Sequence, residues 1–256
     1  MRHIRRSIGY SLAVNPMIGP IHIKAKKGEV AERVIVAGDP ARVEQVASIL
    51  ENARLVNKNR GLLVYTGKYQ GIDISVAMHG IGGPSSAIVF EELRMLGAKV
   101  IVRLGTCGAM FKGAKIGDVV IPTGASYYPG GLFRQYLGSD VCLCAVPDLE
   151  VITKIVESCR KHGLRHFVGP VISSDAFYAE DPNFASYWSS KGVLAVEMEC
   201  ATLFMLGLMR KFRAGALLLV SDSLVEDLGF ASAEELKPYV EKAVYALLDA
   251  LVSIEV

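Results

Sequence analysis

Three arginines beside short glycine-containing segments are the residues best suited to chemistry in this sequence. Arg42 lies in Gly-Asp-Pro-Ala-Arg, Arg60 in Asn-Lys-Asn-Arg-Gly and Arg103 in Arg-Leu-Gly-Thr-Cys-Gly. Arg42 follows the apolar run 33–37 and Arg103 closes the run 100–102, so both are expected at the C-terminal end of a strand, where open α/β sheets bind ligands. A planar guanidinium suits a tetrahedral oxyanion such as phosphate. The pattern predicts an anion site; the alternative is three solvated surface charges.

Two glutamates stand where a predicted strand leads into a helix, in Val196-Glu197-Met198-Glu199. In extended backbone, side chains two residues apart project to one side. Glu197 and Glu199 are therefore suited to gripping vicinal hydroxyls or to acid/base work. The alternative is a glutamate-rich first turn that the helix dipole favours.

An aspartate follows another apolar run, in Val220-Ser221-Asp222. Asp222 is suited to protonating a leaving group, but aspartate after a strand is also a common turn or cap residue. His22 precedes the first predicted strand, and its position alone indicates a surface residue. Phe177 by its type alone is expected to be a core aromatic residue. Cys107 invites a nucleophile hypothesis that lacks a histidine nearby in the sequence, and we do not adopt it.

The segment Gly80-Ile-Gly-Gly-Pro84 follows a strand and opens a helix, as a dinucleotide-binding turn does. The third glycine of that fingerprint would fall at Ser85, and Arg103 stands where an acidic residue is expected at the end of the next strand. A dinucleotide site is therefore disfavoured. The glycines still allow a ligand to approach the backbone at a helix N-terminus.

Composition narrows the class of protein. The 256 residues carry 28 basic and 26 acidic side chains, a net charge of +2, which gives no support to binding of nucleic acid or of acidic membranes. No apolar run is long enough to span a membrane and no signal peptide is evident, so we expect a soluble cytoplasmic protein. The five cysteines lack zinc spacing and are expected to be reduced thiols, and no metal site is predicted.

The elements that must position these residues alternate between strand and helix patterns. Strands are expected at 33–37, 63–69, 72–79, 99–104, 118–122, 167–173, 194–197 and 216–220, and helices at 40–50, 84–96, 148–162, 200–210 and 233–252. Asp39 is the expected N-cap of the first helix, with Pro40 at its first position. This order predicts a single α/β domain at 19–256, with a mixed, mainly parallel sheet covered by helices, and an appendage at 1–18.

Together, these motifs resemble the nucleoside phosphorylase family, which includes hexameric purine nucleoside phosphorylases, uridine phosphorylases and archaeal methylthioadenosine phosphorylases. The resemblance runs from about His22 to the C-terminus and rests on Gly-Asp-Pro-x-Arg, Arg-x-Gly-Thr-Cys-Gly and Val-Glu-Met-Glu in family-like order. It implies a trimer or hexamer whose active sites are shared between subunits. It also implies phosphate as co-substrate, with no metal or organic cofactor.

The resemblance also implies roles for individual residues. Phosphate would be held by Gly38, Arg42, Arg103 and Thr106, together with Arg60 from the adjacent subunit. The ribose would contact Met198 and Glu199, and His22 of the neighbour would approach its 5′ end. Phe177 and Glu197 would lie beside the base and sugar. Asp222, preceded by Ser221, would protonate or hydrogen-bond N7 of a leaving purine.

The expected reaction is reversible phosphorolysis of a purine nucleoside (inosine, adenosine, guanosine or 5′-methylthioadenosine) to free base and ribose 1-phosphate. Uridine phosphorylases carry a Gln-x-Arg signature that reads uracil, and the segment 178–184 contains neither residue type. Uridine phosphorolysis remains an alternative, as does a nucleosidase that uses water. A third alternative is a non-catalytic binding module, in which Asp222 and the glutamate pair would have no use. The arginine that assists the aspartate in bacterial purine enzymes is absent from 223–235.

Overall fold

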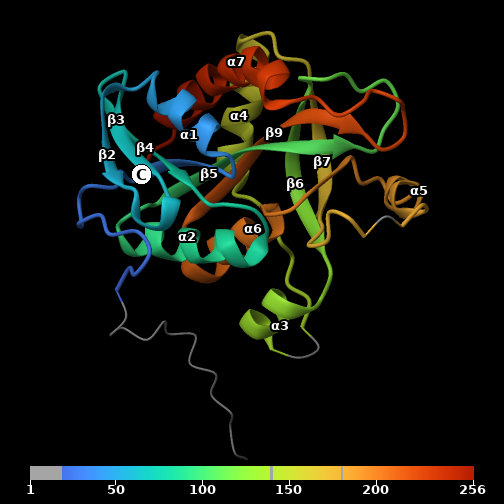
Figure 1. Cartoon of the computed structure of the whole chain (residues 1–256), viewed down its shortest axis with the longest axis horizontal. Coiled ribbons are helices and arrows are strands. Elements are labelled where there is room, and N and C mark those ends of the chain that lie inside the picture. Colours follow the sequence, from blue (N-terminus) through green and yellow to red (C-terminus); the bar gives the residue numbers. More distant parts are fainter. Residues whose placement is uncertain (1–18, 139–140, 180) are drawn as a thin grey trace, which may run out of the picture.

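The sheet at the centre of the molecule lies between two layers of helices. The computed structural model describes residues 19–138, 141–179 and 181–256. Helices α1, α4 and α7 cover one face of the sheet, while α2 and α6 cover the other (Figure 1). The appendage expected at 1–18 lies outside the described residues.

The described strands form one nine-stranded sheet in the order β2-β3-β4-β1-β5-β8-β7-β6-β9, and β5 also pairs with β9. That extra pairing closes five strands, from β5 through β8, β7 and β6 to β9, into a ring. The sheet is mixed, as expected from the sequence, but it is not open along its whole width. The strands are β1 (Arg33–Ala37), β2 (Glu51–Asn57), β3 (Val64–Tyr69), β4 (Ile72–Met78), β5 (Val100–Ala109), β6 (Val119–Tyr127), β7 (His166–Ser173), β8 (Ala195–Glu197) and β9 (Arg213–Ser223).

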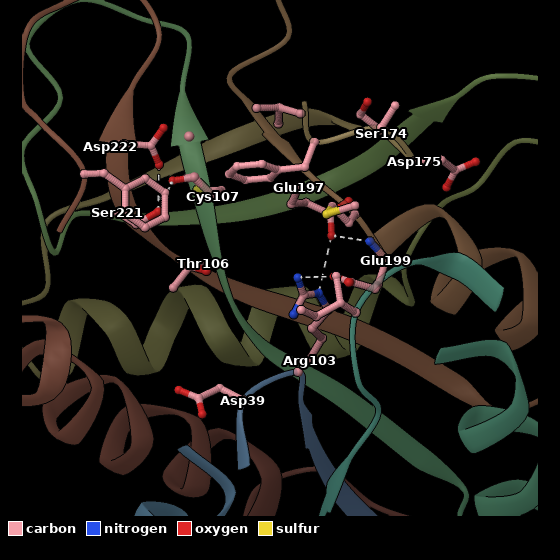
Figure 2. Close-up of a pocket in the computed structure, with 18 of the residues that line it drawn as sticks. Asp39, Arg103, Thr106, Cys107, Ser174, Asp175, Glu197, Glu199, Ser221 and Asp222 are labelled. Atoms are coloured by element: carbon pink, nitrogen blue, oxygen red, sulfur yellow. Dashed lines mark hydrogen bonds and ion pairs between the residues drawn. The ribbon is translucent and has the colours of Figure 1, made fainter. Parts of the chain in front are cut away.

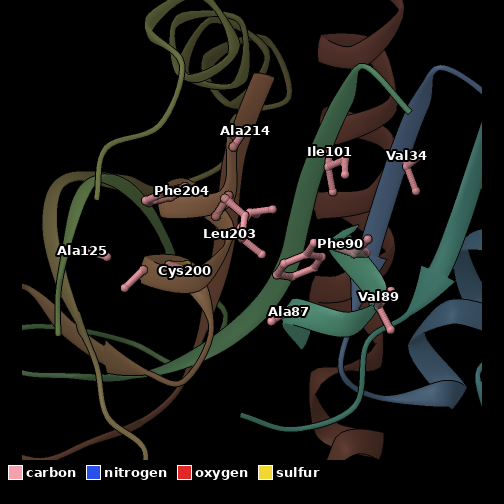
Figure 3. Close-up of a cluster of buried hydrophobic side chains, with 14 of the residues drawn as sticks. Val34, Ala87, Val89, Phe90, Ile101, Ala125, Cys200, Leu203, Phe204 and Ala214 are labelled. Atoms are coloured by element: carbon pink, nitrogen blue, oxygen red, sulfur yellow. The ribbon is translucent and has the colours of Figure 1, made fainter. Parts of the chain in front are cut away.

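The helices bury two apolar clusters, one on each side of the sheet. Phe90 of α2 and Phe204 of α6 belong to one cluster, part of which Figure 3 shows between β1, β5 and β9. Val43 of α1, Ile155 of α4 and Leu247 of α7 belong to the other. The helices are α1 (Pro40–Ala47), α2 (Gly83–Met95), α3 (Gly131–Leu137), α4 (Leu149–Lys161), α5 (Phe184–Ser189), α6 (Cys200–Arg210) and α7 (Ala233–Val252), with a 3₁₀ turn η1 (Asn59–Gly61).

Local capping explains where several helices begin. The Asp39 side chain accepts a hydrogen bond from the Ala41 N–H at 2.9 Å, with Pro40 in the first turn, which confirms the predicted cap of α1. Ser232 and Glu235 form a reciprocal capping box at the start of α7. These caps satisfy N–H groups that have no partner within the helix.

Two strands differ from the prediction in a way that matters for the site. Strands β5 and β9 run several residues beyond the expected ends at 104 and 220. Arg103 therefore lies in the middle of a strand, not at its C-terminal end, and Asp222 lies inside β9. The two strands pair in parallel over most of their length. The strands continue past their apolar runs because of this pairing. The apolar pattern of the sequence alone did not predict how far they extend.

No helix in the described part of the chain is long and apolar enough to cross a bilayer. The five cysteines are all free thiols: Cys107, Cys159 and Cys200 are buried, and Cys142 and Cys144 are exposed.

Candidate functional site

A single large cavity gathers most of the residues that the sequence analysis selected. It has a volume of about 1260 Å³ and is bounded by the segments that follow β1, β4 and β7, by residues of β5 and of the C-terminal end of β9, and by the β8–α6 junction. In Figure 2, Ser221 and Asp222 lie at one end, and Arg103 lies with Glu197 and Glu199 at the other. The predicted residues among its lining are Gly38, Arg42, Arg103, Thr106, Phe177, Glu197, Met198, Glu199, Ser221 and Asp222.

Arg103 is held by carboxylates at two of its nitrogens. Its Nη2 lies 2.5 Å from Glu199 Oε2 and its Nε lies 3.3 Å from Glu197 Oε2. Burial alone would lower the pKa of this guanidinium, but the charges of Glu199 and Glu197 raise it above its usual range. Arg103 is therefore a fixed positive charge in the cavity wall.

Gly105 makes room for this arginine. A Cβ atom at position 105 would lie 2.5 Å from Arg103 Nη1 and 2.7 Å from a methyl group of Leu218. No side chain fits there unless the guanidinium moves. The glycine in the Arg-Leu-Gly motif is thus required by the close approach of Arg103.

Arg42 brings a second positive charge to the same cavity. Its Nη1 donates to the carbonyl of Leu104 at 3.3 Å, which directs the side chain from α1 toward β5. Burial and the nearby charge of Arg103 lower the pKa of Arg42 to about 10, so it stays protonated at neutral pH. Two guanidinium groups in one cavity are suited to binding an anion.

The two glutamates have different local roles. Glu197 Oε2 accepts hydrogen bonds from the N–H groups of Glu199 (2.7 Å) and Cys200 (2.9 Å), so it caps the start of α6. Ser173 Oγ also donates to Glu197. Glu199 instead accepts from the Gly82 N–H at 2.7 Å. Glu197 thus caps α6 while also lining the cavity, whereas Glu199 turns toward the glycine segment and the cavity.

The contact between Glu199 and Gly82 also bears on the dinucleotide hypothesis. An N–H at the start of α2, where a pyrophosphate would bind, already donates to a carboxylate of the protein. That N–H is therefore already paired within the protein. This contact gives no support to a dinucleotide site in this segment.

Asp222 projects into the cavity because of an irregularity in β9. Cys107 pairs with Val220 but Gly108 pairs with Asp222, so Ser221 is an extra residue in the strand. Such a bulge re-aims the side chains next to it. Ser221 Oγ donates to Asp222 Oδ1 at 2.8 Å. Burial raises the pKa of the Asp222 carboxyl, although the bond from Ser221 acts in the opposite direction. A partly desolvated carboxyl of this kind is suited to donating a proton.

His22 and Arg60 do not line the cavity formed by this chain. His22 Nδ1 lies 2.7 Å from Glu92 Oε1 on α2, and the Asn59 side chain donates to the His22 carbonyl at 2.9 Å. Arg60 is exposed in the 3₁₀ turn η1, with a left-handed φ of 55°. The two residues are thus joined through Asn59 on a surface outside the cavity.

The cavity also has aromatic lining that the sequence analysis did not select. Phe230 and Phe177 are 68% and 63% exposed, and their ring centroids lie 6.5 Å apart in an edge-to-face arrangement. The Ala231 N–H donates to the Ser221 carbonyl, which brings the loop after β9 back to the cavity. This return places Phe230 near Phe177, and no spacing in the sequence signals it. Other lining residues that were not selected include Asp39, Ile81, Tyr128 and Asp175.

The thiol of Cys107 is not set up as a nucleophile. Burial, followed by the charges of Glu197 and Asp222, raises the pKa of this thiol far above its usual range. Within the described segments, no group of three or more His, Cys, Asp or Glu side chains is arranged to hold a metal ion.

The fold and the cavity together define an α/β protein whose candidate site places guanidinium groups and carboxylates around one cavity. Residues 32–253 match the model of the Phosphorylase superfamily, and the chain belongs to that family.

Its relatives carry related names. The chain is 36% identical to a guanosine phosphorylase of Halorubrum lacusprofundi, over 91% of this chain and 98% of the relative. It is 36% identical to a DeoD-type purine nucleoside phosphorylase of Caldanaerobacter subterraneus subsp. tengcongensis, over 89% of this chain and 98% of the relative. It is 35% identical to a uridine phosphorylase of Thermococcus kodakarensis, over 89% of this chain and 86% of the relative.

Proposed function

We propose that this protein catalyses the reversible phosphorolysis of purine nucleosides, giving free base and ribose 1-phosphate. One observation carries the proposal: Arg42 and Arg103 share a cavity with Glu199 and Asp222. An anion site, a carboxylate that suits ribose hydroxyls and a carboxyl with a raised pKa are thereby brought together. Family membership and the relatives named purine or guanosine phosphorylase support the same reaction.

The reaction assigns a different task to each end of the cavity. Cleavage of the glycosidic bond builds positive charge on the sugar, as in glycoside hydrolysis. Phosphate held by Arg42, Arg103, Gly38 and Thr106 stabilises that charge and then bonds to C1′. Holding both reactants in place turns a bimolecular collision into a near-attack arrangement.

Asp222 acts on the departing base and Glu199 on the sugar. The protonated Asp222 carboxyl donates to N7, so the purine leaves without a full negative charge. Glu199 and Met198 contact the ribose, while Phe177 and Glu197 lie beside the base and sugar. In this scheme inorganic phosphate is the co-substrate, and neither a metal ion nor an organic cofactor takes part. The proposal also includes a cytoplasmic location and a role in purine salvage.

Two other reactions of the same bond are kept as competitors. Uridine phosphorylase appears among the relatives, but Asp222 matches the purine enzymes and residues 178–184 lack the glutamine and arginine expected for uracil. A nucleosidase would use water and would have no need for a phosphate site that contains both the buried Arg103 and the partly buried Arg42.

The direct experiment is to measure base release from inosine, guanosine, adenosine, methylthioadenosine and uridine, each with and without phosphate. Phosphate-dependent release from a purine nucleoside supports the proposal and names the substrate. Phosphate-independent release would identify a hydrolase, and release from uridine alone would identify the pyrimidine enzyme.

We also propose that the active site is completed by a second subunit of a trimer or hexamer. His22 and Arg60 lie outside the cavity of their own chain but next to each other through Asn59. A surface that carries both can deliver both to a neighbour's cavity, where Arg60 would contact phosphate and His22 the 5′ end of the nucleoside.

Co-expression of two inactive variants tests this sharing. An Arg60→Ala chain retains Asp222, and an Asp222→Ala chain retains Arg60. If each subunit supplies residue 60 to its neighbour's cavity across a symmetric interface, about a quarter of the sites in a random mixture of the two chains should contain both Arg60 and Asp222. Activity well above that of either variant alone is expected. If the mixture stays as inactive as its components, Arg60 acts within its own chain or not at all.

Substitution of two glycines on β5 is expected to cause two different kinetic defects. Gly105→Ala crowds Arg103, and Gly108→Ala places a Cβ in a clash with Leu224 Cδ1 and 2.9 Å from Asp222 Oδ2. We expect the first substitution to raise mainly the phosphate KM and the second to lower mainly kcat. Each effect should be on the order of tenfold or more, because a misplacement of about 1 Å can cost on the order of 10²-fold. Steady-state kinetics with each substrate varied in turn measure both. The same defect in both variants would mean that the strand, not the individual side chain, had been disturbed.

A further inference from the structure

One buried titratable residue next to the anion site has no part in the reaction described above. His79 directly follows β4 and is 0% exposed. Its backbone N–H donates to the Ala37 carbonyl at 2.9 Å, and its ring meets Phe90 edge-on with centroids 5.6 Å apart. The backbone and the ring are therefore both held in place.

The position of the ring favours a neutral imidazole. Burial, and then the charges of Arg103 and Arg42, lower the pKa of His79 well below its usual value. A neutral imidazole has one nitrogen that accepts a hydrogen bond and one that carries a proton. His79 Nε2 lies 3.5 Å from Arg103 Nη1, which can only donate, so Nε2 is the acceptor and Nδ1 carries the proton.

With this contact included, each nitrogen of Arg103 has its own partner. Nε faces Glu197, Nη2 faces Glu199 and Nη1 faces His79. A guanidinium has five N–H groups. Three contacts leave one N–H on Nη1 and one on Nη2, which is a pair suited to two oxygens of one oxyanion.

We propose that His79 is a positioning residue for Arg103: its Nε2 accepts from Nη1 and so keeps the remaining N–H pair aimed at the anion. This inference rests on the proposed function, because it takes phosphate as the anion that Arg103 binds. A neutral acceptor suits this place, since a third carboxylate beside Arg103 would repel phosphate and a cation would repel the arginine.

The competing explanation is that His79 merely fills space. His79 Nδ1 has no hydrogen-bond partner among the described residues. Buried polar atoms without a partner are rare, and an apolar side chain of similar size would avoid one here. Filling space therefore does not explain a histidine at this position, whereas accepting a hydrogen bond from Arg103 does.

Three substitutions at position 79 test the proposal. His79→Leu fills space without an acceptor. His79→Asn is polar but too short to place an acceptor where Nε2 lies, while the longer His79→Gln can do so. We expect the phosphate KM to rise about tenfold in the leucine and asparagine variants, as for loss of a hydrogen bond to a charged group. The glutamine variant should stay within about threefold of the parent, and kcat at saturating phosphate should change little in all three.

Val76→Ala, on the same strand, is the matched control for stability. Val76 is buried and contributes to the packing of α1, α4 and α7 on the sheet, away from Arg103. The Val76→Ala substitution should lower the melting temperature without changing the phosphate KM. An unchanged phosphate KM in His79→Leu, or equal values for the asparagine and glutamine variants, would overturn the positioning role. If the leucine variant does not fold, the difference in phosphate KM between the asparagine and glutamine variants tests the positioning role. Absence of phosphate-dependent base release from the parent enzyme would instead overturn the proposed function.

Discussion

Replacement of Asp222 with alanine is expected to slow phosphorolysis of inosine by about 10²–10⁴-fold, the usual contribution of a general acid. The carboxyl has no ion-pair partner among the described residues, so its removal should leave the fold intact. The phosphate KM should remain near that of the parent because Arg42 and Arg103 are untouched. Steady-state kinetics with each substrate varied separately measure both quantities.

A nucleoside alkylated at N7 provides the control for this prediction. The base of 7-methylinosine already carries a positive charge and leaves without receiving a proton, so Asp222→Ala should convert it at close to the parent rate. Asp222→Asn separates two roles: an amide can donate a hydrogen bond to N7 but cannot transfer a proton. Near-parental turnover of inosine by the asparagine variant would mean that Asp222 acts as a hydrogen-bond partner. Near-parental turnover by the alanine variant would remove it from the mechanism.

The activity should also depend on pH in a defined direction. Burial raises the pKa of Asp222, so the protonated form persists to higher pH than for an exposed aspartate. Activity that needs this proton is lost as the pH rises through that pKa. Asp222→Asn should lack this descending limb with inosine, and the parent should lack it with 7-methylinosine.

Replacement of Arg103 with alanine is expected to damage both the anion site and the fold. Loss of two charge-assisted hydrogen bonds should raise the phosphate KM by about 10²–10³-fold, from ~1.5–3 kcal/mol each with incomplete additivity. Removal of the arginine also leaves Glu197 and Glu199 buried without their cation, which costs about 3–5 kcal/mol in comparable ion pairs. Kinetics and thermal unfolding measure the two effects.

The pH dependence of unfolding identifies the cause of that instability. Burial already raises the pKa of Glu199, and loss of Arg103 removes the main opposing charge. A carboxyl whose pKa is raised in the folded state contributes stability below its unfolded pKa, and this stability is lost as the pH rises. The melting temperature of Arg103→Ala should therefore fall further behind the parent at pH 8 than at pH 5.

Arg210 offers a comparison at a distance from the cavity. Its Nε lies 2.8 Å from Glu91 Oε1, and both side chains are largely buried. Arg210→Ala should lower the melting temperature while leaving the phosphate KM unchanged. If Arg210→Ala raises the phosphate KM as much as Arg103→Ala does, the Arg103 result reflects general loss of structure and not phosphate binding.

Most helices and buried strands could be predicted because apolar patterns and end signals in the local sequence specify them. The predicted helices 200–210 and 233–252 match α6 and α7 residue for residue, since an apolar face and clear ends mark both. Buried strands such as Arg33–Ala37 were equally clear. By contrast β2, Glu51–Asn57, was missed because most of its side chains are exposed and its pattern does not alternate. The short helices α3 and α5 carry too few turns to show a period.

The sequence by itself therefore determined the fold class, most of the elements and the residue types of the candidate site: Arg42, Arg103, Glu199 and Asp222 were all selected from local motifs. Tertiary structure decided how they meet. The pairing of β5 with β9 closes part of the sheet and places Arg103 in mid-strand, and the bulge at Ser221 turns Asp222 into the cavity. The contact from His79 to Arg103 and the approach of Phe230 to Phe177 join segments 24 and 53 residues apart in sequence (103 − 79 and 230 − 177). Strand register and long-range packing set these meetings, because they depend on partners that no local pattern identifies.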